Sequence, residues 1–472
     1  MSTSAITAPT YDPTSTAKAL ADQYVSGMQT QLTNQTTTAT NTAKALSTLS
    51  DAISTYQSAL AGMTGVGHTM LAQSATLSDT TFGTATASST AAAGAYSLFV
   101  QQVATSSQVS YDSLVDGSQL GGQLTINLAD EGAGTNTANF TVQLDGTADT
   151  DGDGKLSVRE LAAAINNASG NAGKVSAGVI TVSGAPRLVL TSKNTGVANT
   201  VSVDATMATD AGLQTGFASR TIMAAAQDAI VYLGDPTNPA TAMIQQASNT
   251  FTNIDGVTFT ATHAQAAGSA PFTLTVGSNS SGTTSNVQAF IDAYNKLKTA
   301  IDGLVSPGDP KTNEAAGAFA HDAGVMSLRN RLVDLLRPTG TLSLASYGIT
   351  ANRDGSLGLD STRLQAQLAI NPTGLDTVIG SAALTGSSGV AGSLNTYLNQ
   401  WSNATTGQIH VRTDANSKLQ SDLTKRQTDL DAKYDSAYQR YLMQFTALQA
   451  LQSTMQNNSS MFSALFSNNS SN

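Results

Sequence analysis

The stretch LSTLSDAISTYQSALAGM, residues 46–63, decides the fold because its apolar residues recur at alternating steps of three and four. These residues are Leu46, Leu49, Ile53, Tyr56, Leu60 and Met63. Such a/d spacing is typical of a helix whose single apolar seam faces a partner helix. The pattern extends back to about Ser15, with a weaker stripe and a Thr-rich run of low helix propensity. We therefore expect one long helix from about residue 15 to residue 63.

The C-terminal end of the chain carries a second stripe of the same kind. Its members are Leu423, Leu430, Tyr434, Ala437, Tyr441, Leu448, Leu451 and Met455. Charged residues such as Lys425, Arg426 and Asp429 lie between them. Each stripe alone fits a helix that faces a globular core. Because two stripes occupy opposite ends of one chain, we favour their pairing with each other.

The middle of the chain has the texture of β-structure. Short runs rich in Val, Thr, Leu and Phe alternate with Gly, Asn, Asp and Ser. The runs are AYSLFVQQV, QLTINL, ANFTVQL, GVITVSG, PRLVLTS, TVSVDA and FTLTVG. Helical patterns at 157–166 and 285–301 interrupt them. The chain is therefore expected to leave a helical stem, to build β-rich domains, and to return to the stem.

This order predicts an α+β fold, with terminal helices paired as a coiled-coil stem and β-rich head domains inserted between them. The expected parts are an N-terminal helical leg and stem (1–75), the first part of an inner β-rich head domain (76–120), an outer β-rich head domain (121–217), the second part of the inner domain (218–285), a stem-proximal α/β domain (286–390) and a C-terminal helical leg (391–472).

The composition excludes several classes of function. Charged residues are 11% of the chain, against roughly 25% in average soluble proteins, and the net charge is −10. No dense Lys/Arg run is present to bind nucleic acid or an anionic membrane. The chain has no Cys, so disulfides and thiolate metal sites are excluded. A polar surface with few charges suits subunits that pack against copies of themselves, because little charge is desolvated on assembly.

The N-terminal sequence lacks the features of a cleaved secretory signal. MSTSAITAPTYDPTSTAK has neither a basic start nor an apolar run. No stretch approaches the roughly 18 apolar residues of a membrane span. We expect a chain that is cytosolic or exported by a route that reads no such signal.

Several segments together resemble the flagellar filament cap family, also called flagellar hook-associated protein 2. They occur in order along the chain, and together with the flanking helices they span nearly all of it: AGAYSLFVQQVATSSQ (93–108), VSAGVITVSGAPRLVLTSKNTGVANTVSV (175–203), NTFTNIDGVTF (249–259), VQAFIDAYNKL (287–297), and YGIT (347–350) with DGSLGLD (354–360). The second is similar to a motif shared by hook-associated proteins and flagellins. The last two resemble the family's helix ending in Tyr-Asn and its Gly-Ile-Thr…Asp-Gly-x-Leu-x-Leu-Asp segment.

This resemblance implies a secreted structural protein, exported through the flagellar apparatus and located at the filament tip. It implies a ring-shaped homo-oligomer whose β domains form a plate and whose terminal helices form legs at the filament end. The implied partners are other copies of the chain, flagellin, the filament end and a flagellar export chaperone. The ring would promote flagellin polymerisation and prevent loss of monomers.

One local motif predicts a metal site. DTDGDGKLSVRE, residues 149–160, matches the twelve-residue calcium loop. The expected ligands are the side chains of Asp149, Asp151 and Asp153, the carbonyl of Lys155, and Glu160 as the bidentate ligand at position 12. Because Ca²⁺ takes six to eight oxygens, these groups fit a calcium ion. The alternative is an acidic solvated turn that caps a helix through Ser157 and Glu160.

We weighed two other classes of function. Calcium-stabilised β domains on a helical stalk also fit a secreted adhesin, and contact with a host surface is compatible with capping. The four histidines lie far apart, and no nucleophile elbow or phosphate loop is present. We therefore expect that the chain is not an enzyme.

Overall fold

A computed structural model describes residues 12–130, 135–337, 342–383 and 385–467. The chain divides into two compact units, Met1–Met70 with Thr284–Asn472, and Leu71–Thr283. The second unit is therefore inserted between the two halves of the first. Helices and sheets both contribute, and the predicted α+β class is confirmed. The finer division into six ranges stays a prediction, and the ends of both legs, 1–11 and 468–472, lie outside the described residues.

The first unit is mainly helical. Its elements are α1 (Pro13–Thr64), α4 (Ser280–Val305), α5 (Ala323–Asp334), η3 (Leu344–Tyr347), β18 (Ile349–Ala351), β19 (Leu357–Leu359), α6 (Ser361–Ile370), α7 (Thr373–Ile379), α8 (Gly389–Ser402) and α9 (Gln408–Ser467). At the start of α1 the Asp12 carboxylate accepts hydrogen bonds from the Thr14 and Ser15 amides, and proline follows it. Both features favour a helix start. Among the described helices, none is long and apolar enough to cross a membrane.

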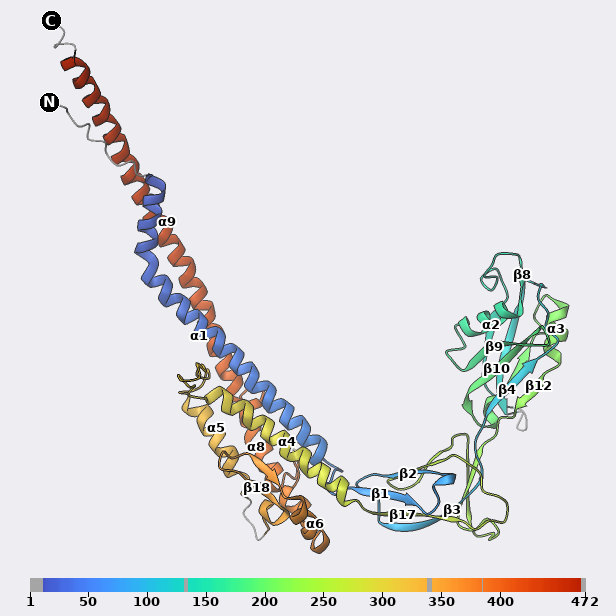
Figure 1. Cartoon of the computed structure of the whole chain (residues 1–472). Coiled ribbons are helices and arrows are strands. Elements are labelled where there is room, and N and C mark those ends of the chain that lie inside the picture. The colour runs from blue at the N-terminus through green and yellow to red at the C-terminus, as the bar shows by residue number, and fades with distance from the viewer. Residues whose placement is uncertain (1–11, 131–134, 338–341, 384, 468–472) are drawn as a thin grey trace. The chain divides into compact units, whose positions relative to one another are not determined.

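Helices α1 and α9 lie side by side and run antiparallel (Figure 1). Their seam is formed by Val25, Leu32 and Ala39 of α1 with Leu423 and Leu430 of α9. Two polar contacts fix the alignment. The side-chain amides of Gln29 and Gln427 exchange hydrogen bonds of 3.1 Å, and Asn416 Nδ2 donates to the Ala39 carbonyl at 3.0 Å. The predicted pairing of the terminal helices is confirmed.

The regular half of the α1 stripe packs differently from our expectation. Its residues from Leu46 to Leu60 are buried and Met63 is half-buried, but around Tyr56 and Gln57 the neighbours are α8 and α4. Gln57 Nε2 donates to the side-chain oxygens of Asn395 at 2.9 Å and Asn399 at 2.8 Å. The expectation of a simple seam against the long C-terminal helix is wrong there. The more regular apolar stripe of α1 packs into a globular core, which requires a wide apolar face. The weaker stripe packs against one helix, for which a narrow apolar seam is enough.

The second unit contains two hydrophobic cores. The first lies between a five-stranded sheet, in the order β1-β17-β3-β13-β14, and a three-stranded sheet, β15-β16-β2. These strands are β1 (Gln73–Leu77), β2 (Gly83–Ala87), β3 (Gly94–Gln102), β13 (Ala229–Leu233), β14 (Ala242–Gln246), β15 (Thr250–Ile254), β16 (Val257–Ala261) and β17 (Phe272–Ser278). Phe251, Phe259 and Phe272 form its aromatic centre.

The second core lies within residues 106–224 and combines three sheets with two helices. A four-stranded sheet has the order β12-β4-β10-β9, and a three-stranded sheet has the order β11-β6-β7. The elements are β4 (Ser106–Tyr111), β5 (Ser118–Gln119), β6 (Gln123–Asp130), β7 (Thr135–Gln143), β8 (Lys155–Leu156), α2 (Val158–Asn167), β9 (Val175–Val182), β10 (Ala185–Thr195), β11 (Thr200–Asp204), α3 (Ala211–Ala218) and β12 (Thr221–Ala224). All seven strand-like runs of the sequence are strands, which confirms the predicted texture.

The buried hydroxyl of Tyr56 leads to a prediction. Among the described residues Tyr56 Oη has no hydrogen-bond partner, and burial raises the pKa of this phenol. An unsatisfied buried polar group costs about 1–3 kcal/mol. We expect Tyr56→Phe to raise the free energy of unfolding of the helical unit by about 1 kcal/mol, measured by denaturant unfolding followed by circular dichroism.

Tyr347→Phe is the matched control. Tyr347 is equally buried, but its hydroxyl donates to the Asn371 carbonyl at 2.7 Å. This substitution should lower stability by about 1 kcal/mol, because it removes a made hydrogen bond. Loss of stability in both variants would contradict the assignment of Tyr56 as an unsatisfied group.

Candidate functional site

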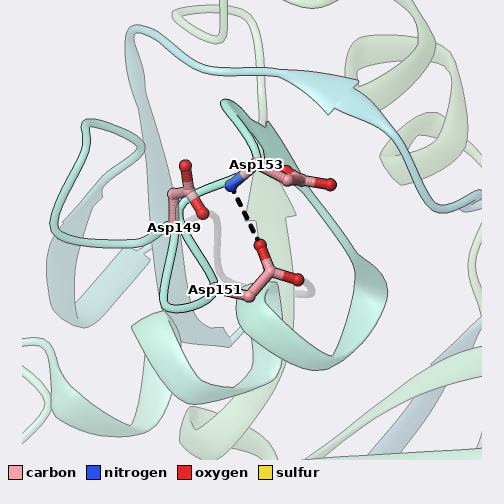
Figure 2. A group of neighbouring side chains, drawn as sticks. All are labelled: Asp149, Asp151 and Asp153. Carbon is pink, nitrogen blue, oxygen red and sulfur yellow. Dashed lines mark hydrogen bonds between the residues drawn. The ribbon is translucent and has the colours of Figure 1, made fainter.

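The acidic loop, residues 149–160, brings three carboxylates together. Asp149, Asp151 and Asp153 each offer one oxygen, and these oxygens lie within 4.8 Å of one another. Figure 2 shows the three side chains around the same turn. Asp149 is half-buried and the other two are exposed. Such a group has the donor chemistry and the spacing that suit a hard divalent cation.

The acidic side chains themselves shape this turn. The Asp149 carboxylate accepts hydrogen bonds from the Gly152 amide at 2.7 Å and the Gly154 amide at 2.8 Å. Asp151 accepts from the Asp153 amide at 3.1 Å. Gly152 and Gly154 have φ of 76° and 79°, a conformation that favours glycine. Hydrogen bonds from backbone amides to the carboxylates therefore stabilise the turn, as is common for short Asp side chains.

Glu160 does not join the three aspartates. Its Oε1 accepts from the Thr150 amide at 2.7 Å, and its Oε2 accepts from the Ser157 amide at 2.9 Å. Ser157 Oγ in turn accepts from the Glu160 amide, which completes a capping box at the start of α2. Lys155 lies in β8, opposite Gln119 of β5. The structure thus brings together the three predicted aspartate ligands and gives Glu160 a helix-capping role, and ligation by the Lys155 carbonyl stays a prediction.

The electrostatics of the loop separate Glu160 from Asp151. Hydrogen bonds from the Ser157 and Thr150 amides lower the pKa of Glu160 to about 2, although desolvation opposes them. The Asp153 amide lowers the pKa of Asp151, but desolvation and the nearby carboxylates of Asp153, Glu160 and Asp149 outweigh it. The net pKa of Asp151 is therefore raised. Like charges inside the turn repel one another, and a bound cation would relieve that repulsion.

The other candidate surface is the far part of α9, which we call the leg end (residues 443–465). The apolar seam of α9 continues there, but its side chains are exposed. The exposed fractions are 42% for Leu448, 57% for Leu451, 63% for Met455, 61% for Phe462 and 66% for Leu465. Our expectation that Leu448, Leu451 and Met455 face the N-terminal helix is therefore wrong.

The alignment of the two helices explains this exposure. The Arg440 guanidinium lies 5.9 Å from the ring of Tyr24, so only about three turns of α1 remain beyond that point. Helix α9 continues to Ser467. A seam that is buried along one half of the helix and bare along the other presents an apolar surface to another helix.

Two of the quoted motifs contact each other, which the sequence alone did not indicate. Asn295 of α4 and Leu357 of β19 exchange hydrogen bonds of 2.8 and 2.7 Å between the side-chain amide and the backbone. Tyr294 Oη donates to the Gly355 carbonyl at 3.3 Å. The Tyr-Asn pair thus holds the hairpin of β18 and β19 on α4. The only sequence feature that linked the two segments was that both resemble motifs of the same family.

Comparison with known proteins bears on the identity of the chain. Residues 10–107 match the family described as flagellar hook-associated protein 2 N-terminus, and residues 226–457 match flagellar hook-associated protein 2 C-terminus. Together these ranges cover more than half of the chain. The chain belongs to the flagellar hook-associated protein 2 family.

Individual members of the hook-associated protein 2 family agree with this assignment. The lateral flagellar hook-associated protein 2 of Vibrio parahaemolyticus is 32% identical over 397 residues, which is 82% of this chain and 85% of the relative. The protein of Escherichia coli K12 is 27% identical over 463 residues, or 93% of each chain. A crystal structure of the E. coli flagellar cap protein has a TM-score of 0.52 at 23% identity, covers 80% of this chain and 99% of that chain, and supports the fold.

Membership in the hook-associated protein 2 family confirms the resemblance seen in the sequence. These comparisons give the adhesin alternative no support. That the chain is not an enzyme stays a prediction, which membership in a family of structural proteins favours. Residues 108–225 lie between the two matched ranges. They contain the acidic loop and most of the four-stranded sheet, so neither family match extends over these features.

The capping-box role of Glu160 predicts an effect of pH. Because its folded pKa lies near 2 and its ordinary value is 4.5, Glu160 stabilises the fold above pH 4.5. That contribution is lost as the pH falls from about 4.5 to about 2. We expect Tm of the full chain to fall over this range, and to fall less steeply in Glu160→Gln.

Asp151→Asn should show the opposite sign, because its raised pKa means that the charged form is disfavoured in the fold. At neutral pH this substitution should raise Tm when no divalent cation is present. If Tm fell equally steeply at acid pH in the wild type and in Glu160→Gln, the capping role of Glu160 would be contradicted.

Proposed function

We propose that this chain is the structural cap at the distal tip of the bacterial flagellar filament, promoting flagellin polymerisation and preventing loss of flagellin monomers. Family membership gives the proposal its general class. The exposed apolar stripe of the leg end is the observation that supports the more specific role at the filament end. The cap acts as a self-associated ring, is exported, and uses the paired terminal helices to contact the filament end.

The leg end has the chemistry that a helical partner recognises. Leu448, Leu451 and Met455 follow steps of three and four on one face of α9. Helix-in-groove recognition reads such anchors on one face of a helix. Burial of an apolar side chain of this size against a partner contributes about 1.5–3 kcal/mol. Flagellin at the filament end is the partner that this function requires.

The same seam needs cover before the chain is exported. An exposed apolar stripe is prone to association in the cytoplasm. A flagellar export chaperone is therefore proposed as an earlier partner, bound to the leg end and displaced at export. Contact with a host surface is compatible with a position at the filament tip, and no described feature specifies it.

The leg end can be tested without disturbing the fold. Leu451→Asp with Met455→Asp places two charges on the bare seam, while both side chains are already exposed. We expect loss of filaments and release of flagellin monomers into the medium when this variant replaces the wild type. Its circular dichroism and Tm should stay unchanged, because no intramolecular contact is removed.

Gln449→Asp with Ser453→Asp is the matched control. These exposed residues lie on the opposite face of the same helix and receive the same charge. This variant should form normal filaments. Normal filaments in both variants would contradict a role of this apolar stripe in contacting the filament end.

Deletion of the gene tests the function itself. A capping protein predicts cells without filaments and with flagellin in the medium, whereas an adhesin predicts normal filaments and reduced attachment. Normal filaments in the deletion strain would overturn the capping proposal, whatever the leg variants show.

We also propose that the acidic loop binds Ca²⁺. Three carboxylate oxygens within 4.8 Å of one another and the complete twelve-residue spacing support this. Bidentate ligation by Glu160 requires its carboxylate to leave the Thr150 and Ser157 amides. Calcium therefore competes with the capping box, and we expect a weak site, with Kd on the order of 10⁻⁴–10⁻³ M. Its role is to make an exposed domain rigid.

Calorimetric titration of the chelator-treated full chain tests the calcium site. Occupancy at one hundred times Kd should stabilise the domain by about 2.7 kcal/mol, which is measurable as a rise in Tm. Asp151→Asn with Asp153→Asn should abolish the heat and the rise. Asp204→Asn with Asp235→Asn removes the same charge elsewhere and should retain both. Absence of calcium-dependent heat in the wild type would return the loop to a solvated acidic turn.

A further inference from the structure

The outer edge of strand β9 is blocked along half of its length. Alternate residues of an edge strand turn both backbone groups away from the sheet. At Ala177 these groups bond to the Asn166 side chain, at 2.9 Å for the amide and 2.8 Å for the carbonyl. At Val175 they bond to the Asn171 side chain, both at 2.9 Å. Two asparagines thus take the place of a neighbouring strand.

The other half of this edge is open. By the same alternation Val179 and Thr181 turn their backbone groups outward, and β9 pairs with β10 alone. The adjacent side chains Ile180 and Val182 are 40% and 37% exposed. Soluble proteins usually protect such edges with charged residues, prolines or bulges. Strand β9, VSAGVITV, contains no charge and no proline.

The opposite edge of the same sheet is also unpaired and apolar. Strand β12 pairs only with β4, and all four of its residues are exposed. Ile222 and Met223 are 57% and 50% exposed. Strand β12 likewise lacks charge and proline. The register of its pairing with β4 shifts between Ile222 and Ala224, so Thr221 and Ile222 form the regular part of this edge.

The strand directions make the two edges complementary. All three pairings within the order β12-β4-β10-β9 are antiparallel. Because the number of strands is even, β12 and β9 run in opposite directions. A second copy that is rotated about an axis parallel to the strands keeps their direction, and therefore brings its β12 to β9 in the antiparallel sense. This is a head-to-tail contact, which forms a ring of identical subunits when the rotation between them closes.

We propose that residues 179–182 of β9 pair with β12 of a second copy of this chain, so that the four-stranded sheet continues from one subunit to the next. A second copy is the favoured occupant because both complementary edges belong to the same sheet. The contact is small, and it acts together with the other contacts of an assembly, where effective concentration is high. Both segments, 179–182 and 221–224, lie within residues 108–225 and outside both family ranges, so the pairing goes beyond family membership.

Disulfide trapping tests this pairing, and the natural chain has no Cys to interfere. Thr181 lies on the same face of the sheet as core-facing Ala177, because the two are an even number of residues apart. Ile222 pairs with core-facing Val109 and therefore lies on that face too. Cross-strand neighbours on one face lie within disulfide range. The full chain with Thr181→Cys and Ile222→Cys should give disulfide-linked oligomers under mild oxidation. Thr181→Cys with Met243→Cys, where Met243 is 53% exposed in β14, should not.

A second variant blocks the edge. Ile180→Lys with Val182→Lys adds charge to exposed positions and should weaken self-association of the full chain at least about tenfold in sedimentation experiments. Met243→Lys with Met326→Lys, at exposed positions elsewhere, should leave association unchanged. Tm should be the same in all. Equal trapping in both Cys pairs, no trapping in either, or unchanged association of the edge variant would each overturn the proposal. The assay uses purified protein, so its outcome is independent of filament formation.

Discussion

The antiparallel pairing of α1 with α9 is the interaction on which the rest of the structure depends. It joins the two ends of the chain, and every β-rich element lies between those ends. The seam is thin: Val25, Leu32 and Ala39 meet Leu423 and Leu430. Short apolar contacts of this kind specify pairing less strictly than a broad core does. The amide contacts across the seam therefore matter for register, because a shift by one turn would leave buried donors unpaired.

Sequence periodicity predicted which residues are buried better than it predicted their neighbours. The stripe through Tyr56 is buried as expected, yet it meets α8 and α4 near Gln57, because an apolar stripe carries no information about its partner. The seam of α9 shows the converse, since Leu451 fits the same spacing and lies exposed. Glu160 is a third case. Position 12 of a calcium loop and position N3 of a capping box coincide in this sequence, so the pattern allowed both roles.

Asparagine side chains repeatedly act as partners for single backbone positions. Asn166, Asn249 and Asn295 each donate to a carbonyl and accept from the amide of the same residue. A carboxamide reproduces the donor and acceptor of a neighbouring strand in one group. Such contacts explain how an irregular α+β chain satisfies its backbone with few charges. They also explain why propensity alone could not predict them, since asparagine is counted as a turn former.

The reliance on neutral amides has a consequence for the medium in which the molecule works. Interactions between exposed charges weaken as salt is added, because ions screen them over about 10 Å at 0.1 M. The Gln29–Gln427 pair and the Gln57 contacts carry no net charge, so screening does not reach them. Because only 11% of residues are charged, screening acts on few of the contacts within the chain. We therefore expect the helical stem to keep the same register at low and at high salt concentration.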